Sequence, residues 1–173
     1  MILTGEEIAH QLETSRIVIE PFAKGQVNPN SYDFRLGETL LRYAVVELDA
    51  SRQNAVEEVR IPDTGFRLEP DRIYLGHTLE VMGSAHYVPI IRAKSSIARL
   101  GLFIHVTADL IDIGSINQWT LQLHAVQPVI LYPRMLIGQV TFWVPQGQIS
   151  LYEGKYQGSR GPAASMSYKD FDA

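Results

Sequence analysis

The sequence contains no cysteine, and this absence removes whole classes of chemistry. Disulfide bonds, thiolate metal sites and cysteine nucleophiles are excluded, so histidines and carboxylates remain as candidate ligands and bases. The chain also has no apolar run near the roughly 18 residues that a membrane helix needs, and no basic segment followed by an apolar stretch. We therefore expect no membrane span or membrane partner, no secretory signal and a cytoplasmic location.

Positive charge is scarce as well. Lys and Arg number 15 against 19 Asp and Glu, which gives a formal net charge of −4. A surface that binds nucleic acid in general needs an excess of positive charge, so we expect no nucleic-acid partner. Any phosphate site in this chain must be local.

The length of 173 residues, 46% of them hydrophobic, suits one domain spanning residues 1–173. Thr4-Gly5-Glu6-Glu7 is a capping-box pattern and predicts a helix to about Thr14. Short β-branched and aromatic runs then alternate with turn residues, which is typical of a β-sandwich or closed barrel. The expected strands cover 17–19, 39–46, 57–61, 73–75, 88–92, 129–131 and 139–144. The Gly- and Pro-rich tail from about Gly154 is predicted to be extended or mobile.

The segment from Lys94 to Gly101 (KSSIARLG) gathers two hydroxyls and two cations at the start of a predicted short helix, Ser96 to Leu100. Unpaired N–H groups and the helix dipole favour an anion at such a point, and Ser, Lys and Arg add donors. A phosphate site is one interpretation. The other is an ordinary Ser-capped turn with two solvated cations, ended by Gly101 as a C-terminal cap.

The run from Trp119 to Ala125 (WTLQLHA) alternates apolar and polar residues and predicts a strand. Its apolar side chains face a core, whereas Thr120, Gln122 and His124 share the opposite face. That polar face either meets solvent or lines an internal or intersubunit cavity.

These segments resemble the dCTP deaminase family of the dUTPase-like superfamily. The family's motifs R-S-S-x-A-R-x-G-L, H-x-T-A, I-D-P-G and T-L-E-L match the region from Lys94 to Leu123, and three further blocks match in order. The matching blocks are 28–37, 94–112, 119–123, 134–139 and 155–162. The resemblance implies a mainly β fold, a distorted jelly-roll-like barrel with a short N-terminal helix and one inserted short helix. It also implies a homotrimer with sites between subunits.

The resemblance carries functional roles to the matching positions. It assigns a grip on the triphosphate to Lys94, Ser95, Ser96 and Arg99, with Ser95 and Arg99 also assisting deamination. It assigns the frame of the pyrimidine and deoxyribose to the backbone of Thr107 and Ala108 and to Asp112, which would meet the 3'-hydroxyl. It places Tyr152 and Lys155 on a tail that closes over the phosphates and base.

One departure from the family falls at the catalytic position, where Gln122 stands in place of Glu. A carboxylate takes a proton from water and returns it to a leaving amine, whereas a neutral amide only orients water. The turn from Ser115 to Gln118 and the pair His124-Ala125 depart from the family too. His124 is a possible replacement base, but it lies roughly 6 to 7 Å further along the strand.

The sequence thus predicts a protein that binds a pyrimidine deoxynucleoside triphosphate, most simply dCTP with Mg²⁺, and deaminates it to dUTP and ammonia if active. Two alternatives stay open: an enzyme that deaminates or hydrolyses a different or modified nucleotide, and a non-catalytic nucleotide sensor or partner subunit. No protein-held metal is expected, because the histidines lack metal-ligand spacing and no zinc deaminase motif is present.

Overall fold

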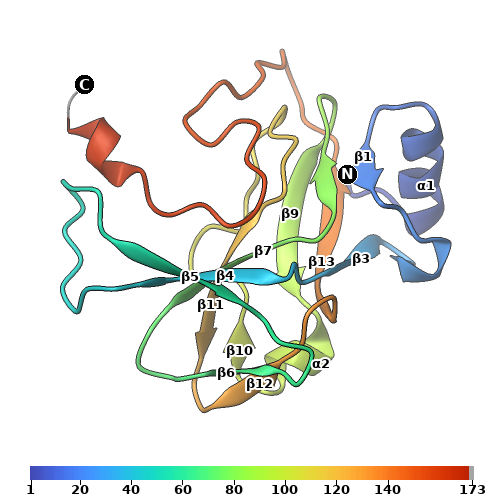
Figure 1. Ribbon diagram of the computed structural model, residues 1–173. Helices are drawn as coiled ribbons and strands as arrows, with labels where there is room; N and C mark the ends of the chain where they lie inside the picture. The colour runs from blue at the N-terminus through green and yellow to red at the C-terminus, as the bar shows by residue number, and fades with distance from the viewer. Residues whose placement is uncertain (172–173) are drawn as a thin grey trace.

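The computed structural model describes residues 1–171, which fold into four small antiparallel sheets (Figure 1). The sheet that matters most for the candidate site has the order β10 (Leu102–Phe103), β11 (Thr120–Ala125), β7 (Tyr74–His77), β4 (Thr39–Tyr43) and β5 (Val56–Arg60). A second sheet has the order β2 (Val27–Asn28), β3 (Ser31–Arg35), β13 (Leu136–Trp143) and β9 (Val88–Ala93). Two ribbons pair β1 (Val18–Glu20) with β8 (Val81–Gly83) and β12 (Val129–Leu131) with β6 (Phe66–Leu68).

Two α-helices and two 3₁₀ turns complete the described chain: α1 (Gly5–Glu13), η1 (Lys24–Gln26), α2 (Ser95–Ala98) and η2 (Ser167–Asp170). The predicted N-terminal helix is confirmed, since the Thr4 hydroxyl accepts a hydrogen bond from the Glu7 N–H. Ile8 on its inner face is fully buried. No helix among residues 1–171 is long and apolar enough to cross a membrane.

The two main sheets enclose a common apolar core. Leu121 and Leu123 of β11 are fully buried, as are Tyr32 and Phe34 of β3 and Val140 of β13. Gly138 permits a close approach within this core, because a Cβ there would lie 2.1 Å from the Phe34 ring. The mainly β fold predicted from the sequence is confirmed.

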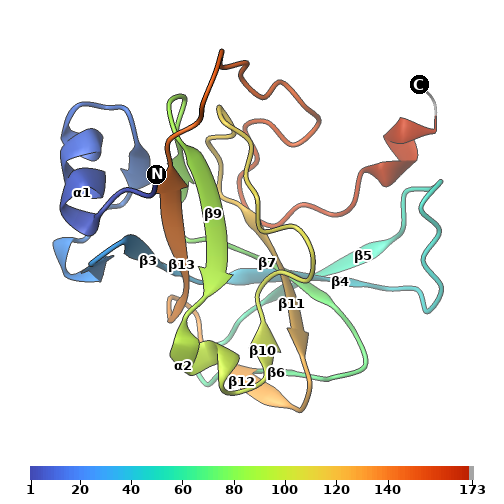
Figure 2. The same cartoon turned by 180° about the vertical axis from the view of Figure 1, so that it is seen from behind.

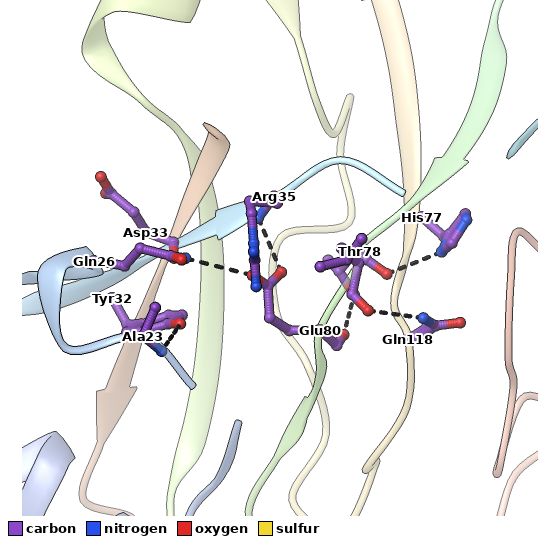
Figure 3. A network of polar contacts seen from close by, with 10 residues as sticks. Ala23, Gln26, Tyr32, Asp33, Arg35, His77, Thr78, Glu80 and Gln118 are labelled. Atoms are coloured by element: carbon purple, nitrogen blue, oxygen red, sulfur yellow. Dashed lines mark hydrogen bonds and ion pairs between the residues drawn. The ribbon is translucent and has the colours of Figure 1, made fainter. Parts of the chain in front are cut away.

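A buried polar network joins the two sheets (Figure 3). Glu80 is completely buried and accepts hydrogen bonds from the backbone N–H and the Nε of Arg35. The Thr78 hydroxyl donates to the Glu80 carbonyl and accepts from the Trp119 N–H. Because each polar group has a partner, the start of β11 is fixed relative to β3 and the β7–β8 connection.

The expected strands all exist, with ends that match or are shifted by up to three residues, but β2, β3, β6, β8 and β10 are additional. The helix expected from Ser96 to Leu100 begins one residue earlier and ends at Ala98, and a turn continues it to Gly101. Gly101 has a φ of 75°, as its predicted capping role requires. The tail from 154 to 166 is irregular and follows a defined path, while its expected mobility stays a prediction.

Candidate functional site

A cavity of about 610 Å³ lies beside the polar face of β11. Strands β4 and β7, the segment from 106 to 112, the turn from 115 to 119 and the C-terminal tail provide its walls. The lining residues are Tyr43, Leu48, Ile73, Leu75, Val106, Thr107, Ala108, Leu110, Ile111, Asp112, Ser115, Asn117, Gln118, Trp119, Thr120, Gln122, Tyr152, Tyr156, Ser159, Ala163 and Ser165. Most of these walls are apolar or aromatic, with a few polar groups, as is typical of a site for a small organic ligand.

Gln122 lines this cavity from β11, where the predicted alternation holds along the whole strand. Its Nε2 donates a 3.3 Å hydrogen bond to the Thr120 carbonyl, and its Oε1 is buried without a hydrogen-bond partner. A buried polar atom in this state costs about 1–3 kcal/mol. The amide is therefore held in the wall by its nitrogen and retains an unused acceptor.

The segment from Val106 to Asp112 forms a second wall and brings Thr107, Ala108 and Asp112 into the lining. Backbone hydrogen bonds tie it to β9: Ile91 N–H donates to the Asp109 carbonyl, and Ile111 N–H donates to the Pro89 carbonyl. All three predicted residues of this segment are exposed. The structure thus brings the predicted sugar and base frame together with Gln122.

The tail roofs the cavity with Tyr152 and Tyr156. Tyr152 N–H donates to the Ile113 carbonyl, and the Tyr156 hydroxyl accepts from the Met166 N–H. Lys155 is not part of the lining, since its Nζ donates a 2.6 Å hydrogen bond to Asp170. The carboxylate of Asp170 raises the pKa of Lys155 above its usual value.

The predicted phosphate-binding residues lie elsewhere. None of Lys94, Ser95, Ser96 and Arg99 lines the cavity. Lys94 Nζ donates a hydrogen bond to the buried carboxylate of Asp33, whereas Ser95, Ser96 and Arg99 are exposed on and beside α2. In two opposite views, α2 lies at the lower end of the molecule, whereas the segment that follows β13, drawn in orange to red, runs through the upper half (Figure 1, Figure 2). One chain therefore does not bring its own predicted phosphate-binding residues into the lining of the cavity.

The histidines do not supply a base to this cavity. His124 lies outside its lining, and its ring lies 6.3 Å from the Phe103 ring, centroid to centroid. Burial lowers the pKa of His105, whose Nδ1 has no hydrogen-bond partner, and burial lowers the pKa of His77. His77 Nδ1 lies 2.9 Å from the Thr78 carbonyl. Within residues 1–171, no three His, Cys, Asp or Glu side chains gather as a metal ligand set.

Several lining residues were not predicted from the sequence. Tyr43 and Tyr156 contribute rings, and Ser115, Asn117 and Gln118 contribute polar groups. The Tyr43 hydroxyl accepts from the Ser165 N–H, which links positions far apart in the chain. The hydrophobic pattern and spacing of the residues around each position do not predict a contact between such distant segments. The departure of 115–118 from the family pattern was the one available indication that this turn has its own role.

Comparisons with known proteins identify the family and the fold. A family model described as dCTP deaminase-like matches residues 2–144. Proteins named "dCTP deaminase, dUMP-forming" from Clostridium beijerinckii and Hathewaya histolytica are 44% and 43% identical over 173 residues, covering 99% of this chain and 99% and 100% of theirs. The crystal structure of 2'-deoxycytidine 5'-triphosphate deaminase from Agrobacterium tumefaciens matches with a TM-score of 0.65 and 22% identity, over 83% of this chain. That match spans 48% of the Agrobacterium chain, and it supports the fold alone.

Proposed function

This chain belongs to the dCTP deaminase-like family, and we propose that it binds dCTP and converts it to dUMP, ammonia and diphosphate. The observation that carries the proposal is Gln122, at the family's catalytic position, in the wall of a 610 Å³ cavity that also holds Thr107, Ala108 and Asp112. The similarity to dUMP-forming proteins over the whole chain supports loss of diphosphate as well as of the amine.

The reaction consumes two waters. In the deamination, water adds to C4 of the cytosine ring and the bond from C4 to the exocyclic amine breaks, releasing ammonia. In the hydrolysis, a second water attacks the α-phosphorus and diphosphate leaves. Asp112 would accept from the 3'-hydroxyl, and Arg99 would stabilise negative charge in both steps, with Ser95 as a hydrogen-bond donor.

Gln122 makes deamination the slow step in this proposal. Its amide oxygen orients a water by accepting one of its protons, but an amide carries no proton to the leaving amine. Loss of a general acid or base costs about 10²- to 10⁴-fold in rate. The hydrolysis at the α-phosphorus does not involve C4 and is not subject to this loss.

The complete site would lie between subunits. Because Arg99 is exposed beside α2, apart from the tail (Figure 2), and does not line the cavity of its own chain, Arg99 of one copy would meet the cavity of another copy. This separation supports the homotrimer expected from the sequence. Mg²⁺ would arrive with the triphosphate, since such ions are held largely by substrate phosphates and waters.

The neutral amide also favours a second candidate, hydrolysis of a pyrimidine triphosphate that needs no deamination, such as dUTP. The test is to incubate the chain with dCTP or dUTP and Mg²⁺ and to quantify dUMP, ammonia and diphosphate. The proposal expects one ammonia and one diphosphate for each dUMP formed from dCTP, and faster dUMP formation from dUTP. Formation of dUMP from dUTP alone would support the second candidate, and no change in either nucleotide would contradict both.

A further inference from the structure

The side-chain amide of Gln122 has an orientation that its own strand determines. Its Nε2 donates to the Thr120 carbonyl at 3.3 Å, and its buried Oε1 has no partner among residues 1–171. The reverse orientation would place Oε1 against the Thr120 carbonyl, and two oxygens that only accept would then oppose each other. The amide oxygen is therefore the group that a ligand beside Gln122 would satisfy, and it would do so with a hydrogen-bond donor.

The surroundings of this amide are apolar. Leu75 lies directly opposite Gln122 in the pairing of β7 with β11, is 6% exposed and lines the same cavity, as does Ile73. A hydrogen bond is electrostatically stronger in such surroundings than in water, and an acceptor left unpaired there is costly. A ring that brings a donor to Gln122 is thus favoured over a ring that brings a second acceptor.

The wall of the cavity offers no substitute for a carboxylate at position 122. Among the described residues that line it, Asp112 is the one carboxylate, and no His, Lys or Arg is present. The proposed function places Asp112 at the 3'-hydroxyl, away from the base. The other titratable groups are the hydroxyls of Tyr43, Tyr152 and Tyr156, and each already accepts a backbone N–H of the tail. This chain therefore brings no side chain into the cavity that can carry a proton to the amine at C4.

The two reactive ends of a bound dCTP then differ in rate. Attack of water at C4 is slowed about 10²- to 10⁴-fold without a proton carrier. Attack of water at the α-phosphorus forms a new P–O bond, releases the water proton to solvent, and breaks the bond to diphosphate, which leaves with the electron pair. Residue 122 takes no part in this step, in which Arg99 and Ser95 would stabilise the developing charge. Hydrolysis that precedes deamination yields dCMP.

We propose that Gln122 accepts a hydrogen bond from the exocyclic amine of cytosine, and that the chain hydrolyses dCTP to dCMP and diphosphate with this amine retained. Uracil carries an oxygen at C4, which would oppose the amide oxygen. The inference rests on the proposed function for the place of the base and for hydrolysis at the α-phosphorus. It adds a third product and assigns Gln122 a role in selecting cytosine.

The first test incubates the native chain with dCTP and Mg²⁺ and resolves dCMP, dUMP, ammonia and diphosphate over time. We expect dCMP in at least about tenfold excess over dUMP, because the loss at C4 is larger than that. Diphosphate should equal the sum of the two monophosphates, and ammonia should equal dUMP. Gln122→Glu should reverse the ratio of dCMP to dUMP.

The products separate the inference from the proposed function. With dUMP as the only monophosphate from dCTP, and ammonia equal to diphosphate, the inference is overturned and the proposed function stands. With dCMP and no ammonia, the inference stands and deamination fails. Absence of any monophosphate from dCTP overturns the inference even if dUTP is hydrolysed.

The second test measures the contact to the amine by binding alone. The analogues α,β-imido-dCTP and α,β-imido-dUTP, which resist hydrolysis at the α-phosphorus, are titrated into the native chain and into Gln122→Met, which keeps the length of the side chain without the acceptor. The native chain should bind the cytosine analogue about fivefold more tightly, as one neutral hydrogen bond predicts, and Gln122→Met should lose this preference. Equal affinity of the native chain for the two analogues would show that Gln122 does not select the amine.

Discussion

Lys94 Nζ donates a hydrogen bond to Asp33 Oδ2, so the cation directly before α2 is neutralised by a carboxylate of β3. Asp33 Oδ1 accepts from Asn28 Nδ2 at 2.7 Å and from Gln139 Nε2 at 3.0 Å. The family resemblance assigns Lys94 to the triphosphate together with Arg99. The structure divides the pair, because Lys94 is partly buried in an ion pair and Arg99 is exposed.

Replacing Lys94 with Met should lower the free energy of unfolding by about 2–3 kcal/mol, since Asp33 would lose its counter-charge while only 8% exposed. The two amide donors on Asp33 reduce the loss below that of a fully isolated charge. Urea denaturation measures it. Asp33→Asn in the same background should restore part of the stability, and an unchanged unfolding free energy in Lys94→Met would show that the ion pair contributes nothing.

Replacing Arg99 with Ala should affect triphosphate binding and leave stability nearly unchanged. Stability should stay within about 0.5 kcal/mol because the side chain is exposed. Triphosphate binding should weaken by about tenfold or more through loss of charge-assisted hydrogen bonds. Calorimetric titration with dCTP and Mg²⁺ compares the native and Arg99→Ala chains. Equal nucleotide affinity in the two chains would mean that the segment from Lys94 to Gly101 is only a capped turn.

Stability should fall as the pH falls from about 6.5. Burial lowers the pKa of His77 in the folded chain below the value of 6.5 expected when unfolded, and His105 shifts the same way. The unfolded chain therefore binds more protons over the window between the two pKa values, so acid favours unfolding there. The contribution of neutral His77 and His105 to stability is fully present above about pH 6.5 and declines below it.

The variant His77→Asn keeps a donor for the Thr78 carbonyl and removes the titrating ring. Urea denaturation at pH 7.5 and 5.5 should show a smaller loss for His77→Asn than for the native chain. His10→Asn, at an exposed position of α1, serves as the control. The same loss in all three chains would show that His77 does not contribute to the pH dependence.

The separation of α2 from the tail predicts that the chain assembles. Light scattering during size exclusion should give three times the 19.4 kDa mass of one chain. A mass near 19.4 kDa at micromolar concentration would contradict an intersubunit site, because Arg99 would then have no cavity to reach.

The sequence predicted the strand that carries Gln122 because its two faces differ, and alternation is a local signal. It did not predict β3, where Ser31 to Phe34 are all buried and no alternation marks the strand. The family resemblance identified Thr107, Ala108 and Asp112, which the structure brings to one cavity with Gln122 and Tyr152. The docking of the tail and the contribution of Tyr43 arise from contacts between distant segments, which neither propensity nor spacing reveals. The cytoplasmic location stays a prediction.

The cavity beside Gln122 is proposed to hold the pyrimidine ring with C4 next to the amide. The most direct test compares ammonia release from dCTP by the native chain and by Gln122→Glu, with dCTP affinity measured for both. A carboxylate at this position supplies the missing proton carrier, so Gln122→Glu should release ammonia at least about 10²-fold faster with similar affinity. Equal rates in the two chains, whether both fast or both negligible, would contradict a catalytic position at residue 122.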